Sequence, residues 1–100
     1  MNKLKQCTSL EEVREQVDLL DDKIVELISD RSHYIRQAAG FKNSVDEVKA
    51  DDRIEYIMQR LRHKAIEHEV SPNMITDLYK IMIDEMVETE IAELRNKDAF

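Results

Sequence analysis

The stretch VREQVDLLDDKIVELISDRSHYIRQA, residues 13–38, carries apolar residues at steps of three and four. These residues are Val13, Val17, Leu20, Ile24, Leu27, Ile35 and Ala38. Such steps predict one helix face turned toward a core. Arg31 stands on this face where an apolar residue is expected, and a buried guanidinium without an anionic partner is costly. The pattern therefore predicts an anion beside Arg31, either an internal acid such as Asp21 or a bound ligand.

The composition favours a single all-α domain. The chain of 100 residues has one Gly, one Pro and no Trp, which leaves little for tight turns or β-hairpins. A hydrophobic content of 42% supports a core, and a charged content of 37% supplies a solvated exterior. One hundred residues match the usual size of one domain, so we expect residues 1–100 to form a single helical domain.

Charge and residue usage exclude several classes of protein. The net charge of −7 argues against nucleic-acid binding, which usually needs a basic patch. No stretch approaches the ~18 uncharged residues of a membrane span. The single cysteine, Cys7, forms no internal disulfide, so we expect a reducing, cytoplasmic location. The three histidines, His33, His63 and His68, lack the spacing of a helical metal site, and no metal is predicted.

Three helices are predicted along the chain. The first begins at the S-x-x-E capping box Ser9–Glu12 and runs to about Phe41. The second begins near residues 50–52, and the third begins at Ser71–Pro72, an N-cap followed by proline. Between the first two helices, Ser44–Glu47 repeats S-x-x-E and indicates a short turn or an early start of the second helix.

The length of the first helix predicts a dimer. About 33 residues would reach ~50 Å, whereas a compact chain of this length is only about 34 Å across. One end must project, yet the apolar face continues along the whole helix. We therefore expect an intertwined homodimer. The alternative is a helix broken near residues 30–32 within a four-helix monomer.

Further cations accompany Arg31. Lys42 follows it by eleven residues, about three helical turns, so both side chains leave the same side of the helix. Arg53 shares a side of the second helix with Ile57, and antiparallel packing would bring it near the end of the first helix. Arg14 lies about 25 Å from Arg31 along the axis, so it could join such a site only from a partner chain. The alternative for Arg14 is a solvated ion pair with an acid one turn away.

Glu90 is an acid on the apolar side of the third helix, four residues after Met86. Interior acids are rare unless they are paired or neutral. One interpretation is a salt bridge to one of the arginines. The other is a carboxylic acid that stays protonated and donates a hydrogen bond. We further expect Lys42 to be unpaired, so that its replacement leaves the fold intact.

These residues, in order and spacing from about Cys7 to Arg95, resemble the all-α class of chorismate mutases, including the similar isochorismate-pyruvate lyases. The resemblance rests on Arg14, Arg31, Lys42, Arg53 and Glu90 with their neighbours. It implies an enzyme of the shikimate pathway, for aromatic amino acid or salicylate synthesis, that binds a small dianionic substrate without a cofactor. It also implies an intertwined homodimer with shared sites.

The resemblance assigns roles by position. Arg31 and the partner's Arg14 would hold the substrate carboxylates, Lys42 would reach a carboxylate and the ether oxygen, and Glu90 would face that oxygen. Arg53 would support the anionic end. Lys42, Glu90 and Arg31 are the catalytic candidates. Many mutases have Glu directly after Arg53, where this chain has Ile54, which leaves isochorismate-pyruvate lyase activity open. A non-catalytic dimeric helical adaptor is the alternative of another class.

Overall fold

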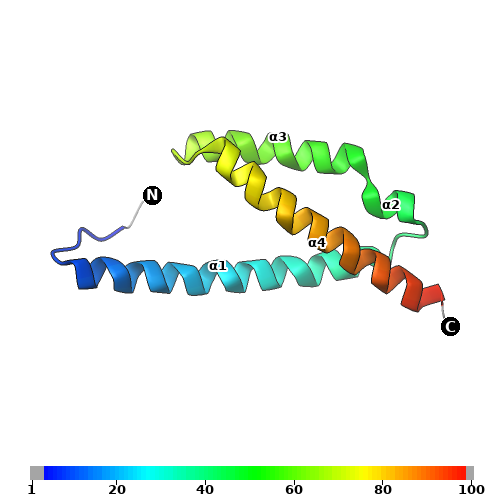
Figure 1. Ribbon diagram of the computed structural model, residues 1–100, viewed down its shortest axis with the longest axis horizontal. Coiled ribbons are helices and arrows are strands. Elements are labelled where there is room, and N and C mark those ends of the chain that lie inside the picture. Colours follow the sequence, from blue (N-terminus) through cyan, green and yellow to red (C-terminus); the bar gives the residue numbers. More distant parts are fainter. Residues whose placement is uncertain (1–3, 99–100) are drawn as a thin grey trace. The chain divides into compact units, whose positions relative to one another are not determined.

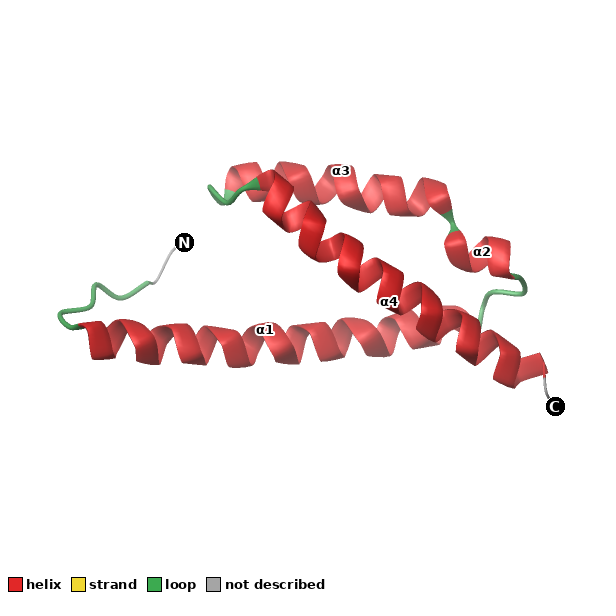
Figure 2. Ribbon diagram, viewed as in Figure 1, coloured by secondary structure: helices red, strands yellow, loops and turns green. Residues whose placement is uncertain are grey.

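The computed structural model describes residues 4–98, and the side chains of residues 4–96. Within that part every regular element is a helix, so the predicted all-α fold class is confirmed (Figures 1 and 2). Three long helices and one short helix follow one another along the chain. They are α1 (Leu10–Ala39), α2 (Val45–Lys49), α3 (Asp51–Glu67) and α4 (Pro72–Asp98).

The helix ends lie where the capping signals place them. At the start of α1, Ser9 Oγ accepts a hydrogen bond from the backbone N–H of Glu12 at 3.1 Å. The carboxylate of Glu12 in turn accepts from the N–H of Thr8 at 2.9 Å. Before α4, Ser71 Oγ accepts from the N–H of Met74 at 3.2 Å. These bonds satisfy donors that have no partner inside a helix, so the sequence-based starts of α1 and α4 are confirmed.

The chain divides into two compact units, with the boundary in the sequence between His33 and Tyr34. In the second unit α4 packs against α3 and against α2. Its buried apolar residues are Ala39, Val48, Ala65, Ile83 and Leu94. Glu90 is also buried, with only 4% of its surface exposed. Among the described residues it is the one charged residue that is buried. The core of the second unit therefore contains a carboxyl group whose burial needs an explanation.

Helix α1 is continuous through residues 30–32, where Ser32 Oγ donates to the carbonyl oxygen of Ile28 at 2.9 Å. The alternative of a helix broken at this point is therefore wrong. The 30 residues of α1 correspond to a length of ~45 Å. Its apolar face is solvent-exposed in the single chain: Val17, Leu20, Ile24 and Leu27 are between 47% and 64% exposed.

None of the helices in the described part combines the length and the apolar character that a bilayer crossing requires.

Candidate active site

A short polar contact of the second unit joins Lys42 to Glu90. Lys42 Nζ donates a hydrogen bond to Glu90 Oε1 at 2.7 Å, the distance of a charge-assisted bond. The side chain of Glu90 is 5% exposed and that of Lys42 is 25% exposed. The expectation that Lys42 is unpaired is therefore wrong. The expected salt bridge of Glu90 exists, and the structure places Lys42, which was not the expected partner, in it.

The helical register of α4 places Glu90 in the interior. Ile83, Val87, Glu90 and Leu94 follow one another at steps of four, three and four, and so lie on one face. Ile83 and Leu94 on this face are buried. Glu90 thus occupies a core position of an apolar face. Its ion pair with Lys42 compensates for the loss of water around the carboxylate.

Lys42 lies in the turn between α1 and α2. Its backbone N–H donates to the carbonyl oxygen of Ala39 at 3.2 Å, directly beyond the last turn of α1. The next residue, Asn43, donates its N–H to Glu47 Oε2 at 2.7 Å. Glu47 N–H donates to Ser44 Oγ at 3.2 Å, so the predicted S-x-x-E signal is the capping box of the short helix α2.

Arg53 lies in the first turn of α3 and is exposed. Its guanidinium carbon lies 5.3 Å from the centre of the Tyr56 ring, within the range of a cation–π contact. The structure therefore brings Lys42 and Glu90 together and places the guanidinium of Arg53 on an aromatic ring. This contact was not predicted from the sequence, although the i,i+3 spacing of the two residues allows it.

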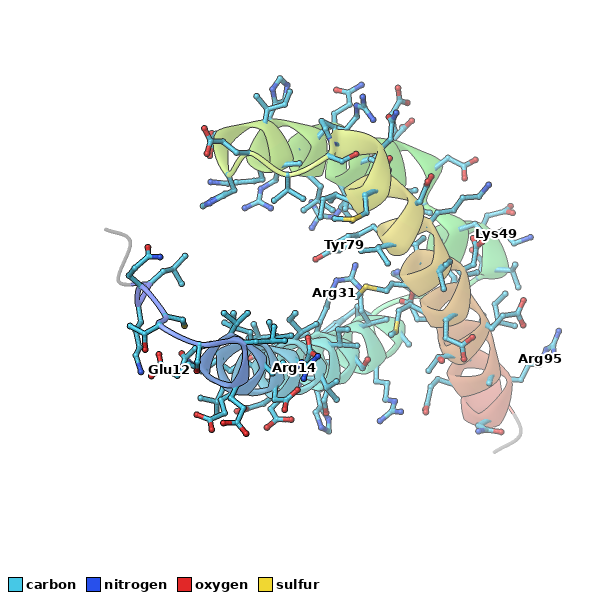
Figure 3. All side chains as sticks on the ribbon, turned by 60° about the vertical axis from the view of Figure 1, so that its left-hand side comes forward. Glu12, Arg14, Arg31, Lys49, Tyr79 and Arg95 are labelled. Atoms are coloured by element: carbon cyan, nitrogen blue, oxygen red, sulfur yellow. The ribbon has the colours of Figure 1, made fainter. Side chains whose placement is uncertain are left out.

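Arg14 and Arg31 lie on α1 in the first unit, and Figure 3 labels both. Arg14 is exposed in the N-terminal half of the helix. Arg31 is half-buried, and its Nη1 atom is shielded from solvent. Among the described residues no group of three His, Cys, Asp or Glu side chains could hold a metal ion.

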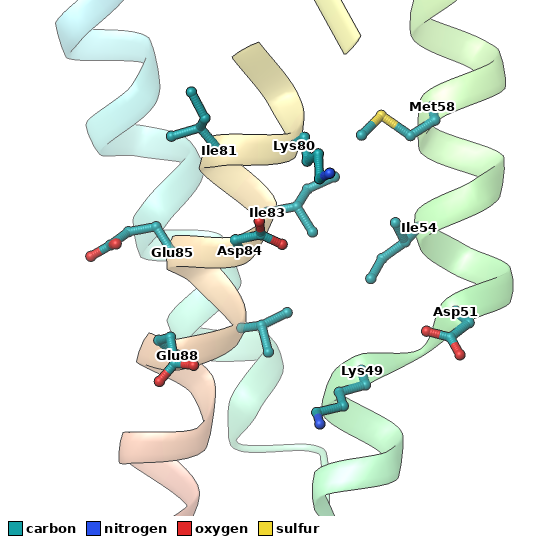
Figure 4. A pocket seen from close by; sticks show the side chains of 11 residues that line it. Lys49, Asp51, Ile54, Met58, Lys80, Ile81, Ile83, Asp84, Glu85 and Glu88 are labelled. Carbon is teal, nitrogen blue, oxygen red and sulfur yellow. The ribbon is translucent and has the colours of Figure 1, made fainter. Parts of the chain in front are cut away.

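A cleft of about 760 Å³ opens in the second unit between α4 and the segment formed by α2 and α3 (Figure 4). Its apolar lining comes from Ile54, Met58, Ile83, Ile81 and Val87. Its charged lining comes from Lys49, Asp51, Lys80, Asp84, Glu85 and Glu88. Val87 and Glu90 share a face of α4, three positions apart.

The cleft contains none of the five candidate cations and acids, but it does contain Ile54, the residue after Arg53. Lys49 and Lys80 were not predicted from the sequence as candidate site residues. Both are single lysines among acids on exposed helix faces, and such residues carry no sequence signal.

Comparison with known proteins adds a family to this geometry. The family model described as chorismate mutase type II matches residues 13–91, a stretch that contains Arg14, Arg31, Lys42, Arg53 and Glu90. The chain belongs to the type II chorismate mutase family. Its membership confirms the resemblance seen in the sequence and makes the chain an enzyme of the chorismate mutase type.

Two relatives represent the mutase and the lyase activities. A chorismate mutase of Methanocaldococcus jannaschii is 32% identical over 76 residues, which cover 75% of this chain and 77% of the relative. An isochorismate pyruvate lyase of Pseudomonas aeruginosa is 27% identical over 77 residues, which cover 77% of this chain and 76% of the relative. The comparisons therefore establish the family, whose members here act on two different substrates.

Proposed function

We propose that this member of the chorismate mutase family converts chorismate to prephenate by a Claisen rearrangement. The observation that carries the proposal is the contact of 2.7 Å between Lys42 and the buried Glu90. It provides a fixed cation and a carboxyl group in a poorly hydrated place, within a chain whose family catalyses this kind of reaction. The rearrangement needs no cofactor and no covalent intermediate, so binding and charge stabilisation are the work of the site.

Lys42 stabilises the transition state. Negative charge grows on the ether oxygen as the carbon–oxygen bond breaks, and a donor that is already in place stabilises this charge more than the ground state. An ammonium group has three N–H donors, and Glu90 accepts from one of them. The side chain is 25% exposed, and we assign its remaining donors to a substrate oxygen and a substrate carboxylate.

Glu90 acts as a hydrogen-bond donor in the complex. As a carboxylate it is compensated by Lys42 before the substrate binds. A bound dianion competes for Lys42 and adds negative charge beside a group that is only 4% exposed. Uptake of one proton removes this repulsion and turns Glu90 into a donor toward the ether oxygen.

The arginines bind the carboxylates of the substrate. Arg31 and Arg14 stand seventeen positions apart on the single helix α1, so one small molecule cannot touch both within one chain. An intertwined homodimer supplies Arg14 from the partner chain. The exposed apolar face of α1 supports this proposal, because a second copy would remove that face from water. Arg53 supports the anionic end of the substrate after it leaves the Tyr56 ring.

We assign residues 1–100 to one domain, because the family match crosses from the first unit into the second. The lone Cys7 fits a cytoplasmic location.

The second candidate is isochorismate-pyruvate lyase activity, which yields salicylate and pyruvate. It is favoured by Ile54, because an apolar side chain lines the cleft where many mutases place a glutamate that contacts the substrate hydroxyl. Loss of a polar contact to the substrate hydroxyl lowers the discrimination between two substrates whose hydroxyl groups lie at different positions. The similarity to the Pseudomonas aeruginosa lyase supports the same candidate.

One experiment distinguishes the candidates. The purified protein is mixed with chorismate and, separately, with isochorismate, and prephenate, salicylate and pyruvate are quantified. Prephenate as the main product, with the higher kcat/KM for chorismate, supports the mutase. A higher kcat/KM for isochorismate overturns it in favour of the lyase. Turnover of neither substrate favours a dimeric helical adaptor.

A further inference from the structure

A carboxylate outside the Lys42–Glu90 ion pair stabilises the turn that carries Lys42. Glu47 Oε2 accepts the backbone N–H of Asn43 at 2.7 Å, the shortest distance among the helix-capping bonds of the described residues. Asn43 directly follows Lys42, so this bond fixes the peptide group on the C-terminal side of the lysine. The Lys42 N–H, bonded to Ala39 at 3.2 Å, fixes the N-terminal side.

Helix α2 fixes the position of the Glu47 carboxylate that accepts this hydrogen bond. Ser44 closes the other half of the capping box by accepting the Glu47 N–H at 3.2 Å. Val48, one residue after Glu47, is only 3% exposed, and α2 packs against α4, the helix that carries Glu90. The carboxylate of Glu47 therefore links the backbone beside Lys42 to a short helix that is anchored on the same α4 as Glu90.

We propose that Glu47 is a positioning residue for Lys42, which holds the Lys42 ammonium against Glu90 through the backbone of Asn43. The proposal rests on the proposed function of Lys42. A flexible lysine stem has many rotamers, and only a fixed backbone origin makes its ammonium a preorganised donor. Displacement of a catalytic group by ~1 Å can lower a rate strongly, so a cap at the surface can control the reaction.

The chain offers a matched control for this cap. Ser71 accepts the Met74 N–H at 3.2 Å at the start of α4, the same type and length of bond as that of Ser44 at α2. Ser71→Ala removes one cap without touching the turn of Lys42. Glu47→Gln is the conservative variant, because the amide oxygen of Gln still accepts the Asn43 N–H while the negative charge is lost.

The test measures kcat with the better of the two substrates for wild type, Glu47→Ala, Glu47→Gln and Ser71→Ala. We expect about a 10-fold loss for Glu47→Ala, and values within about twofold of wild type for Glu47→Gln and Ser71→Ala. In a Lys42→Ala background, Glu47→Ala should cause no further loss, because its effect passes through Lys42. An equal loss in both backgrounds, or a loss of the same size in Ser71→Ala, overturns the proposal.

A second readout does not depend on turnover. The ¹H–¹⁵N signal of the Lys42 ammonium should be observable in wild type and Glu47→Gln, because Glu90 slows its exchange with water. It should be lost or shifted toward that of a free lysine in Glu47→Ala. An unchanged signal in a folded Glu47→Ala protein contradicts the proposal. If the wild-type protein converts neither substrate but shows this pattern of NMR signals, the proposed function is refuted and the positioning role of Glu47 is supported.

Discussion

Lys42 Nζ and Glu90 Oε1 lie 2.7 Å apart although the two residues are 48 positions apart in the chain. The contact joins the turn after α1 to the core face of α4. Glu90 contributes a nearly buried carboxyl group, and Lys42 keeps a quarter of its side chain exposed. The pair therefore has one partner that is held by the core and one that can still meet a ligand.

Replacement of Lys42 by Ala should lower kcat by ~10²-fold or more, the scale for loss of one donor to a developing oxyanion. Arg31→Ala should lower kcat and also raise KM, because the guanidinium binds a substrate carboxylate in the ground state. Steady-state kinetics on the two variants measure both effects. Lys64→Ala is the matched control, because Lys64 is an exposed lysine that pairs with Glu67 at 3.4 Å on α3. A kcat of Lys42→Ala within a few-fold of Lys64→Ala contradicts the role of Lys42.

The same ion pair should contribute to stability. Lys42→Ala leaves the Glu90 carboxylate buried without the cation that compensates it, at a cost of about 3 kcal/mol unless the group takes up a proton. The double variant Lys42→Met with Glu90→Leu removes both charges and should be more stable than Lys42→Ala alone. Urea unfolding at neutral pH measures the three free energies of unfolding. Equal stability of wild type and Lys42→Ala would mean that the pair contributes nothing to the fold.

Substrate binding should take up a proton at Glu90, because the dianion competes for Lys42. The value of kcat should therefore fall as pH rises, since the protonated form that donates the hydrogen bond becomes scarcer in the complex. Glu90→Gln keeps a donor that does not titrate, so its profile should be flatter on the alkaline side. Parallel pH–rate profiles of the two proteins check this prediction. Superimposable profiles would show that Glu90 is not the neutral donor.

Much of the fold could be predicted because its signals are local. Capping boxes at Ser9 and Ser44, the Ser71–Pro72 start and Gly40 beyond the last residue of α1 all act within a few residues. Helix periodicity likewise placed Glu90 on a core face, where it is buried. These features depend on the backbone geometry of one helix at a time, which a sequence records directly.

The partners of the charged residues could not be predicted in the same way. The pairing of Lys42 with Glu90 depends on the tertiary packing that brings α4 to the turn after α1, whereas the sequence alone favoured one of the arginines as the partner of Glu90. The contact of Arg53 with Tyr56 depends on a rotamer choice at the surface of α3. Long flexible side chains have many rotamers, and tertiary packing selects among them.

We propose that Lys42, Glu90 and Arg31 of one chain work with Arg14 of a second chain. Arg14→Ala and Arg31→Ala proteins are each assayed, then unfolded together, refolded and assayed with chorismate, after heterodimers are confirmed by mass spectrometry. Each heterodimer has one site with both arginines and one with neither. Random mixing therefore predicts recovery of about a quarter of wild-type activity from two nearly inactive parents. Refolded heterodimers that stay as inactive as both parents would contradict the shared site.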